Sequence, residues 1–233
     1  LNLHSTNSAL VVRHQGINWT YGELQARVDQ LAMGLIHLGI EPGDRVGIWG
    51  PNSSEWVLVQ LATAKIGAIM VCINPAYRLY ELEYALNKVE CKTLITDVSF
   101  KTSDYLGMIN TLAPELESSH PGHLEAKKLP YLKHVIRMGS DNTPGMYNFD
   151  AVCAAGTDDD QATMDALQGR LQPDDAINIQ FTSGTTGNPK GATLSHCNIL
   201  NNGFLPGLAM HLGPEDKLCM PVHLYHYLGM VVS

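Results

Sequence analysis

The stretch GDRVGIWGPNSSEWVLVQLATAKIGAIMVCINP, residues 43–75, contains the clearest signal for the fold. Residues 44–49 follow a Pro-Gly turn and predict a short strand. A helix that Asn52 or Ser53 caps is then expected through about residue 66, and residues 68–73 predict a buried strand. A strand, a helix and a strand in this order indicate a crossover connection between parallel strands.

The same alternation extends on both sides of this stretch. Upstream, two short strands precede a helix whose start is marked by a capping box of Thr20 and Glu23. Downstream, a helix is expected over residues 81–89 and a strand over residues 92–96. The sequence therefore predicts an α/β fold of layered, mostly parallel sheets flanked by helices.

Five large aromatic side chains lie on the apolar faces of these predicted helices and strands. We expect them to belong to the core rather than to a stacking platform. They are Trp49, Trp56, Tyr77, Tyr80 and Tyr84.

Composition and charge exclude several classes of protein. Hydrophobic residues make up 45% and charged residues 16% of the chain, which is too apolar and too weakly charged for intrinsic disorder. The 15 Lys and Arg against 23 Asp and Glu give a net charge of -8, so nucleic acid is not an expected partner. The longest apolar run, residues 57–73, is shorter than the roughly 20 residues of a membrane span, and no transmembrane segment is expected.

Potential metal ligands are scattered rather than grouped. Three consecutive acidic residues, 158–160, are predicted to be a solvated linker or a helix start rather than a metal site. The cysteines are odd in number and lack CxxC spacing, which argues against a disulfide framework and a zinc site, and favours a reducing compartment. The five cysteines are Cys72, Cys91, Cys153, Cys197 and Cys219.

The stretch FTSGTTGNPKGATLSH, residues 181–196, carries the strongest chemical signal. Its glycines let backbone N–H groups turn toward an anion, its hydroxyls donate hydrogen bonds, and Lys190 adds a positive charge, as a polyphosphate requires. Residues on both sides favour strands, so the loop is predicted at the tip of a hairpin. The predicted phosphate-binding residues are Thr182, Ser183, Gly184, Thr185, Thr186, Gly187, Asn188, Pro189, Lys190 and Gly191.

Two alternatives exist for this loop at the level of residues alone. A Walker A loop requires G-x-x-x-x-G-K-[ST] before a helix, whereas Lys190 lies three residues after Gly187 and is followed by Gly191, which weighs against a P-loop NTPase. A flexible Gly/Thr turn without any ligand is the other alternative.

Residues 182–191 resemble the signature S/T-S-G-S/T-T-G-x-P-K-G of the AMP-forming adenylating enzymes and match it at every position. This family includes acyl- and aryl-CoA ligases, firefly luciferase and nonribosomal peptide adenylation domains. TYGEL at 20–24 and residues 43–89 and 177–202 are similar to the branch of medium-chain fatty-acyl-CoA synthetases. The resemblance covers nearly the whole chain from about Leu10.

The resemblance implies a two-step activation of a fatty acid. A carboxylate attacks the α-phosphorus of Mg²⁺-bound ATP to give acyl-AMP and pyrophosphate, and the thiolate of coenzyme A then displaces AMP. ATP, Mg²⁺ and coenzyme A are the implied cofactors and co-substrates, and a medium-chain fatty acid is the implied substrate. An intracellular location is expected, the cytoplasm in a bacterium or the mitochondrial matrix in a eukaryote.

The segment PVHLYHYLG, residues 221–229, resembles the family motif P-x-P-x-Y-H-x-x-G, whose His lies beside the acyl carboxylate. The resemblance makes His226 the predicted catalytic residue. The segment departs from the motif at His223, where proline is usual, and at Tyr227, where a small residue is common. A metal site of His223 and His226 lacks a third ligand, and no metal ligands are assigned; a structural role for His226 stays open. His196 is predicted to be structural, at the start of a helix.

The resemblance also implies the domain organisation, that of the N-terminal part of the large domain of an adenylate-forming enzyme. Residues 1–175 are predicted to form the first α/β subdomain, with 100–175 irregular and partly helical. Residues 176–233 are predicted to form the phosphate-loop hairpin and an incomplete second subdomain.

The family's later motifs, which bind adenine and ribose and supply the adenylation lysine, have no counterpart in this sequence. We therefore expect a truncated chain without turnover of its own, with the missing C-terminal part of the same polypeptide as partner. Poor solubility or association in isolation is expected as well. An alternative of another class is a catalytically dead nucleotide-binding or interaction protein.

Overall fold

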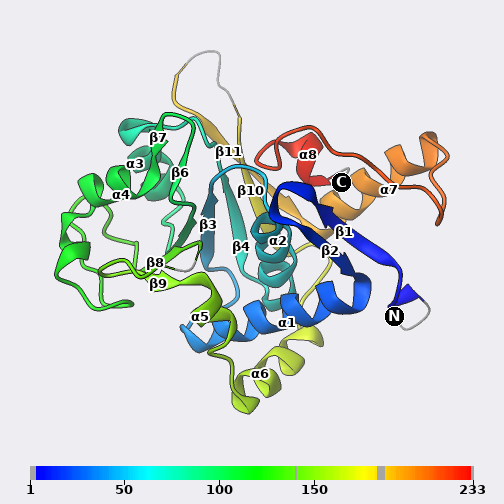
Figure 1. Cartoon of the computed structure of the whole chain (residues 1–233), viewed down its shortest axis with the longest axis horizontal. Coiled ribbons are helices and arrows are strands. Elements are labelled where there is room, and N and C mark those ends of the chain that lie inside the picture. The colour runs from blue at the N-terminus through cyan, green and yellow to red at the C-terminus, as the bar shows by residue number, and fades with distance from the viewer. Residues whose placement is uncertain (1–3, 140, 183–186, 232–233) are drawn as a thin grey trace.

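The structure, a computed structural model, describes residues 4–139, 141–182 and 187–231. At its centre lies a seven-stranded sheet in the order β11-β10-β4-β3-β5-β8-β9 (Figure 1). Neighbouring strands are parallel except β10 and β11, which pair antiparallel. The strands are β3 (Arg45–Trp49), β4 (Ile69–Ile73), β5 (Thr93–Thr96), β8 (His134–Arg137), β9 (Tyr147–Asn148), β10 (Ala176–Thr182) and β11 (Lys190–Ser195).

Two short antiparallel pairs accompany this sheet. The first joins β1 (Ser8–Val12) to β2 (Ile17–Thr20), and the second joins β6 (Ser99–Phe100) to β7 (Ser103–Asp104). The helices are α1 (Tyr21–His37), α2 (Ser54–Ile66), α3 (Leu79–Lys88), α4 (Tyr105–Leu112), α5 (Phe149–Cys153), α6 (Asp158–Gln168), α7 (His196–Ala209) and α8 (Tyr227–Val231). The predicted α/β architecture is confirmed.

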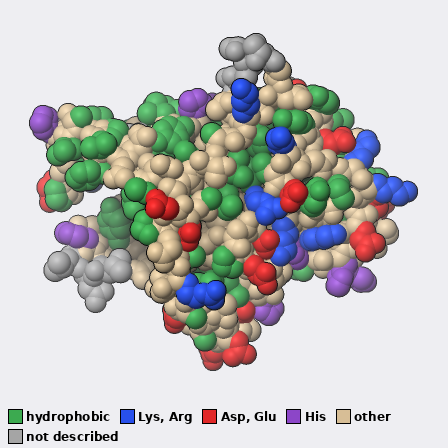
Figure 2. All heavy atoms as spheres, turned by 180° about the vertical axis from the view of Figure 1, so that it is seen from behind, with side chains coloured by type: hydrophobic (Ala, Val, Ile, Leu, Met, Phe, Trp, Pro, Cys, Tyr) green, Lys and Arg blue, Asp and Glu red, His purple; other side chains and the backbone are tan. Residues whose placement is uncertain are grey.

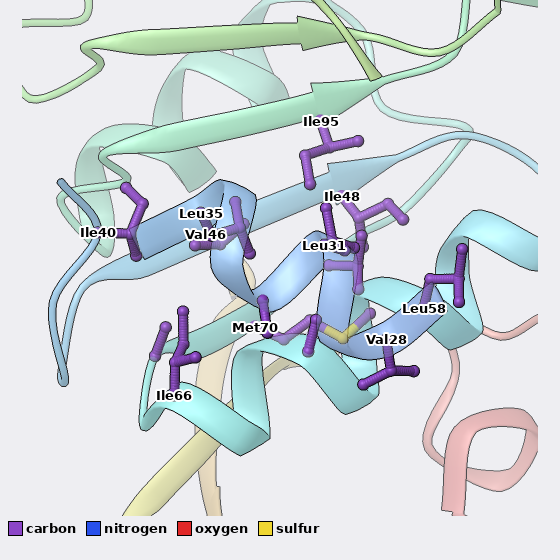
Figure 3. Packing of buried hydrophobic residues seen from close by; sticks show 14 of the residues in the cluster. Val28, Leu31, Leu35, Ile40, Val46, Ile48, Leu58, Ile66, Met70 and Ile95 are labelled. Carbon is purple, nitrogen blue, oxygen red and sulfur yellow. The ribbon is translucent and has the colours of Figure 1, made fainter. Parts of the chain in front are cut away.

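Two apolar clusters cover the two faces of the sheet. Successive side chains of a strand point to opposite faces, so β3 sends Val46 and Ile48 to one cluster and Trp49 to the other. Figure 3 shows the first cluster, in which residues of α1 and α2 such as Leu31 and Ile66 lie over the strands. Helices α3 and α4 contribute to the second cluster. The sheet is therefore a buried middle layer, as parallel sheets usually are.

Local sequence signals account for several helix boundaries. The predicted capping box starts α1: the Thr20 hydroxyl accepts from the Glu23 N–H at 3.2 Å, and the Glu23 carboxylate accepts from the Thr20 N–H at 2.8 Å. Ser53 is the N-cap of α2, although its side chain makes no capping hydrogen bond. Helix α3 starts at Leu79 rather than at 81, because the Glu81 carboxylate accepts from the N–H of Arg78.

The phosphate-loop hairpin continues the same sheet. Strand β10 pairs parallel with β4, and residues Asn178, Ile179 and Gln180 lie opposite 70–72. The division between residues 175 and 176 stays a prediction. Among the described residues no helix is both long and apolar enough to cross a lipid bilayer.

Candidate phosphate and acyl site

The candidate site lies at the carboxyl ends of three neighbouring parallel strands. β3 ends at Trp49 and is followed by Asn52, β4 ends at Ile73 and is followed by Tyr77, and β10 ends at Thr182. Open α/β sheets bind ligands outside the carboxyl ends of their strands. Strands β10 and β11, which flank the predicted phosphate loop in Figure 1, therefore bring its two ends to the edge of the sheet where a ligand is expected.

The loop is held at both ends by paired strands. Thr182 lies opposite Lys190 and Phe181 opposite Gly191 in the β10–β11 ladder, and the Thr182 hydroxyl donates to the Lys190 carbonyl at 3.4 Å. The predicted hairpin is confirmed. The predicted residues Ser183, Gly184, Thr185 and Thr186 lie outside the described residues.

The backbone explains why two positions of the motif are glycine. Gly187 has a φ of 145°, a conformation that side chains disfavour. A Cβ on Gly191 would lie 3.0 Å from the Ile179 Cγ2 atom, so this position keeps β11 close to the side chain of β10.

Lys190 supplies the positive charge at the end of the loop. Its side chain is exposed, and in the described part of the chain its ammonium group takes part in none of the ion pairs. An ammonium without such a partner can meet a phosphate oxygen without first breaking an existing ion pair.

Two tyrosines of α3 contact the far half of the loop, which sequence reasoning missed. Tyr80 OH donates to Asn188 Oδ1 at 3.2 Å, and Tyr84 OH donates to the Pro189 carbonyl at 3.3 Å. The prediction that Tyr80 belongs to the core is wrong: its side chain is 67% exposed, because it lies on the outer face of α3. Tyr80 and Tyr84 are four residues apart, which aligns their hydroxyls on one face of the helix. This spacing is the only local sequence feature that hints at a shared partner.

The other aromatic predictions have mixed outcomes. Trp49 and Trp56 are fully buried, as expected. Tyr77 is half-buried and packs against the second core cluster, so it borders the core, and Tyr84 is half-buried as well. The Tyr77 ring lies edge-on to Phe181, with 6.5 Å between the ring centroids. Its hydroxyl pKa is raised mainly by burial, and then by the nearby Glu81, Tyr225 and Tyr84.

His226 lies in an exposed turn before α8. The turn is closed by the His226 N–H, which donates to the His223 carbonyl at 3.0 Å. The His226 ring is edge-on to Tyr225 at 6.2 Å, and Tyr225 in turn lies near enough to Tyr77 to affect its pKa. Tyr77 and Phe181 form one aromatic pair at the base of the loop, and Tyr225 and His226 form another.

His196, which follows the loop hairpin, has a different position from His226. His196 is the first residue of α7, which Ser195 caps through the Asn198 N–H. Its Nε2 atom is buried and finds no hydrogen-bond partner in the described part of the chain. This position agrees with the structural role predicted for it. Across residues 4–139, 141–182 and 187–231, no three His, Cys, Asp or Glu side chains are grouped so as to hold a metal ion.

The chain is similar to known proteins over nearly its whole length. The profile of a family described as AMP-binding enzyme matches residues 2–233. The mitochondrial medium-chain acyl-CoA ligase ACSF2 of Bos taurus is 47% identical over 228 residues, covering 96% of this chain and 37% of the relative. The ACSF2 of Danio rerio is 44% identical over 225 residues, with 96% and 37% covered. The chain thus spans little more than a third of the length of these relatives.

Solved structures share the fold. Acetoacetyl-CoA synthetase from Streptomyces lividans superimposes with a TM-score of 0.74 at 24% identity, covering 93% of this chain and 32% of that one. ATP-bound MatB from Rhodopseudomonas palustris gives a TM-score of 0.68 at 27% identity, with 94% and 38% covered.

Proposed function

The chain belongs to the AMP-binding enzyme family, and from this membership we propose that it serves the ATP-dependent activation of a medium-chain fatty acid to acyl-AMP and then to acyl-CoA. The observation that carries the proposal is the β10–β11 hairpin, whose ends bring Thr182 and the exposed Lys190 together at the carboxyl edge of the sheet. The relatives named medium-chain acyl-CoA ligases support the choice of substrate.

The physical difficulty of the first step is electrostatic, since a carboxylate must approach a triphosphate that is already negative. The chain's own contribution is to hold and screen the β- and γ-phosphates, with backbone N–H groups, the Thr182 hydroxyl and the Lys190 ammonium. Positioning the reacting groups in this way lowers the barrier without covalent catalysis. Mg²⁺ prefers phosphate oxygens and water, so we assign it to the ATP phosphates and to no side chain of this chain.

We assign the acyl end of the site to the segment around His226. An imidazole N–H can donate to a carboxylate oxygen and thereby orient it toward the α-phosphorus. The influence of Tyr225 on the pKa of Tyr77, which in turn packs edge-on to Phe181 of β10, supports an assignment of this segment to the same edge of the sheet as the loop. We then expect two rings to shape the acyl pocket, that of Tyr225 and that of Tyr227, which stands where the family motif commonly has a small residue.

The short span of the chain limits what it does alone. Because it covers 37% of the length of the ACSF2 relatives, we propose that it supplies the phosphate loop and part of the acyl pocket, and that turnover needs the remainder of such a polypeptide. The same observation favours the second candidate, a nucleotide-binding protein without catalysis. A mitochondrial matrix location is proposed if the source is eukaryotic, and a cytoplasmic one if it is bacterial.

The test is fatty-acid-dependent exchange of pyrophosphate into ATP, measured for this chain and for the chain joined to the remaining length of an ACSF2 relative. We expect exchange with medium-chain acids only in the longer protein. Exchange by the short chain would refute the need for the remainder, and exchange in neither would favour nucleotide binding without catalysis.

Lys190→Ala tests the phosphate assignment in the same assay. Loss of one charge-assisted hydrogen bond of about 1.5 to 3 kcal/mol predicts a decrease of roughly 10- to 100-fold in the exchange rate. The free energy of unfolding should change by less than about 0.5 kcal/mol, because the side chain is exposed. Lys128→Ala, another exposed lysine outside the site, is the matched control. An unchanged rate in Lys190→Ala would overturn the assignment.

A further inference from the structure

Asn52, in the turn after β3, makes two hydrogen bonds to the main chain around His226. Its Nδ2 atom donates to the Val222 carbonyl at 2.9 Å, and its Oδ1 atom accepts from the Leu224 N–H at 2.7 Å. Both bonds are half-buried, and they join residues 170 or more positions apart in the sequence. One amide side chain therefore satisfies a donor and an acceptor of an irregular segment that has no strand partner at these two residues.

The other end of the segment is held independently. The Met230 carbonyl accepts from Gln60 Nε2 at 3.2 Å, and the Met230 sulfur lies 3.1 and 3.2 Å from the side-chain amides of Asn178 and Gln180. Met230 is only 2% exposed. Residues 225–229, which include the exposed His226, therefore lie between two anchored positions, the main chain at 222–224 and the buried Met230.

Hydrogen bonds connect the main chain of His226 to both anchored positions. A displacement of the main chain near 223 should therefore also displace His226. The His226 N–H donates to the His223 carbonyl, and the Met230 N–H donates to the His226 carbonyl at 3.1 Å. A Cβ on Gly229 would lie 2.4 Å from the His223 oxygen, so the backbone at 229 packs against residue 223 with no room for a side chain. Residue 223 lies between the two main-chain groups that Asn52 binds.

We propose that Asn52 is a positioning residue for the acyl site: its side-chain amide fixes the main chain at 222 and 224 and thereby the direction of the His226 ring. This inference rests on the proposed function of His226. It adds a residue from the first crossover of the sheet to a site otherwise formed by the loop and the segment before α8. Misplacement of a reacting group by about 1 Å can cost roughly 100-fold in rate.

The first experiment reads the position of the segment without any activity. In the 233-residue chain, hydrogen exchange of the Leu224 amide reports its bond to Asn52, and the ring resonances of His226, assigned with His226→Gln, report its surroundings. Asn52→Ala should accelerate exchange at Leu224 at least tenfold and shift the His226 resonances. Asn52→Asp keeps an acceptor for the Leu224 N–H but loses the donor to Val222, so it should restore most of the protection.

Asn87→Ala is the matched control, since Asn87 is also half-buried and donates from Nδ2 to a distant carbonyl, that of Lys128, at 2.8 Å. This variant should leave Leu224 and His226 unchanged. The inference is overturned if Asn52→Ala changes neither signal, or if Asn87→Ala changes them equally. Should Asn52→Ala fail to fold, Asn52→Asp decides in its place: loss of its bond to Val222 should shift the His226 resonances, and unchanged resonances would overturn the inference.

The second experiment measures kinetics in the longer protein described above. Asn52→Ala should reduce kcat/KM for the fatty acid by roughly 10- to 100-fold and leave the KM for ATP unchanged. An equal loss toward both substrates, or none, would contradict a positioning role. If the parent protein shows no fatty-acid-dependent exchange, the proposed function fails, whereas the Leu224 and His226 signals still decide whether Asn52 positions the segment.

Discussion

His134, the first residue of β8, is a titratable side chain held in the core. It is 7% exposed, and its Nδ1 atom has no hydrogen-bond partner among the residues that the structure describes. Burial lowers its pKa to about 4, with Lys92 adding to the effect and Asp44 opposing it. Because the folded state binds this proton less readily than the unfolded chain, stability is full above about pH 6.5 and is lost as the pH falls toward 4.

His134→Gln should remove this component of the pH dependence. Between pH 7 and pH 4 the parent chain should lose on the order of 3 kcal/mol of unfolding free energy more than the variant, since each pKa unit corresponds to about 1.4 kcal/mol. Urea denaturation at several pH values measures the difference. Parallel pH profiles of the two proteins would show that His134 titrates normally in the folded state.

The cysteines should differ sharply in reactivity. Burial raises the pKa of the Cys72, Cys91 and Cys153 thiols to about 12, whereas Cys219 is exposed. Since the thiolate is the nucleophile, iodoacetamide at pH 8 should modify Cys219 first and should reach Cys72 and Cys91 only after unfolding. Peptide mass spectrometry over a time course measures this order, with Cys219→Ser as the control. Early modification of Cys72 would contradict the burial described here.

Single residues show where sequence reasoning succeeds and where it ends. The Thr20–Glu23 capping box could be predicted because both partners lie within one helical turn. The contacts of Asn52 and Tyr80 could not be predicted, because their partners at 222–224 and 188 lie more than 100 residues away in the sequence and no local pattern indicates them. The phosphate loop is the exception, since its chemistry is contained in ten consecutive residues.

At the scale of elements, the contact between α1 and α5 depends on a glycine. A Cβ on Gly34 would lie 2.0 Å from the Val152 carbonyl oxygen, which is too close for any atom. Gly34→Ala should therefore destabilise the protein by about 1 to 3 kcal/mol, even though alanine favours a helix by roughly 1 kcal/mol.

Gly207→Ala in α7 is the matched control for that substitution. A Cβ there meets nothing within 4 Å, so only the helix propensity acts, and the free energy of unfolding should rise or stay level. Thermal or urea denaturation of both variants measures the contrast. Equal effects in the two helices would mean that α1 and α5 do not pack as closely as described.

The elements themselves were largely predictable, and their order in the sheet was not. Apolar runs between turns predicted β3, β4 and β5 and the helices between them, because each element carries its own periodicity. That β10 would lie beside β4, as an extension of one sheet, depends on Asn178 and Gln180 of β10, whose side-chain amides contact the sulfur atoms of Cys72 in β4 and of the distant Met230. No segment of the sequence specifies that pairing by itself.

At the scale of the whole molecule, the surface around α7 is unusually apolar. Figure 2 shows hydrophobic side chains gathered on the lobe at its left, on the side where α7 lies. Large apolar patches on soluble proteins favour association. The exposed residues include Leu200 at 71%, Phe204 at 66%, Leu205 at 60% and Leu208 at 61%.

We expect the isolated chain to self-associate through this surface. Sedimentation velocity should show an average mass that rises with concentration, and replacing Leu200, Phe204 and Leu208 together by Gln should reduce that rise. The exposed Val11, at 58% but on β1, gives the control substitution Val11→Gln, which should have little effect. A monomer at all concentrations would contradict the prediction and the expectation of poor solubility.

The pairing of β4 with β10 also has a consequence for the time course of folding. Met70 lies opposite Asn178, so more than 100 residues must be synthesised between one strand and its neighbour. During that interval β3, β4, β5 and β8 can already form, and the buried edge of β4 is open to other chains. Translation speed between residues 73 and 176 should therefore affect the yield of native protein more than its final stability.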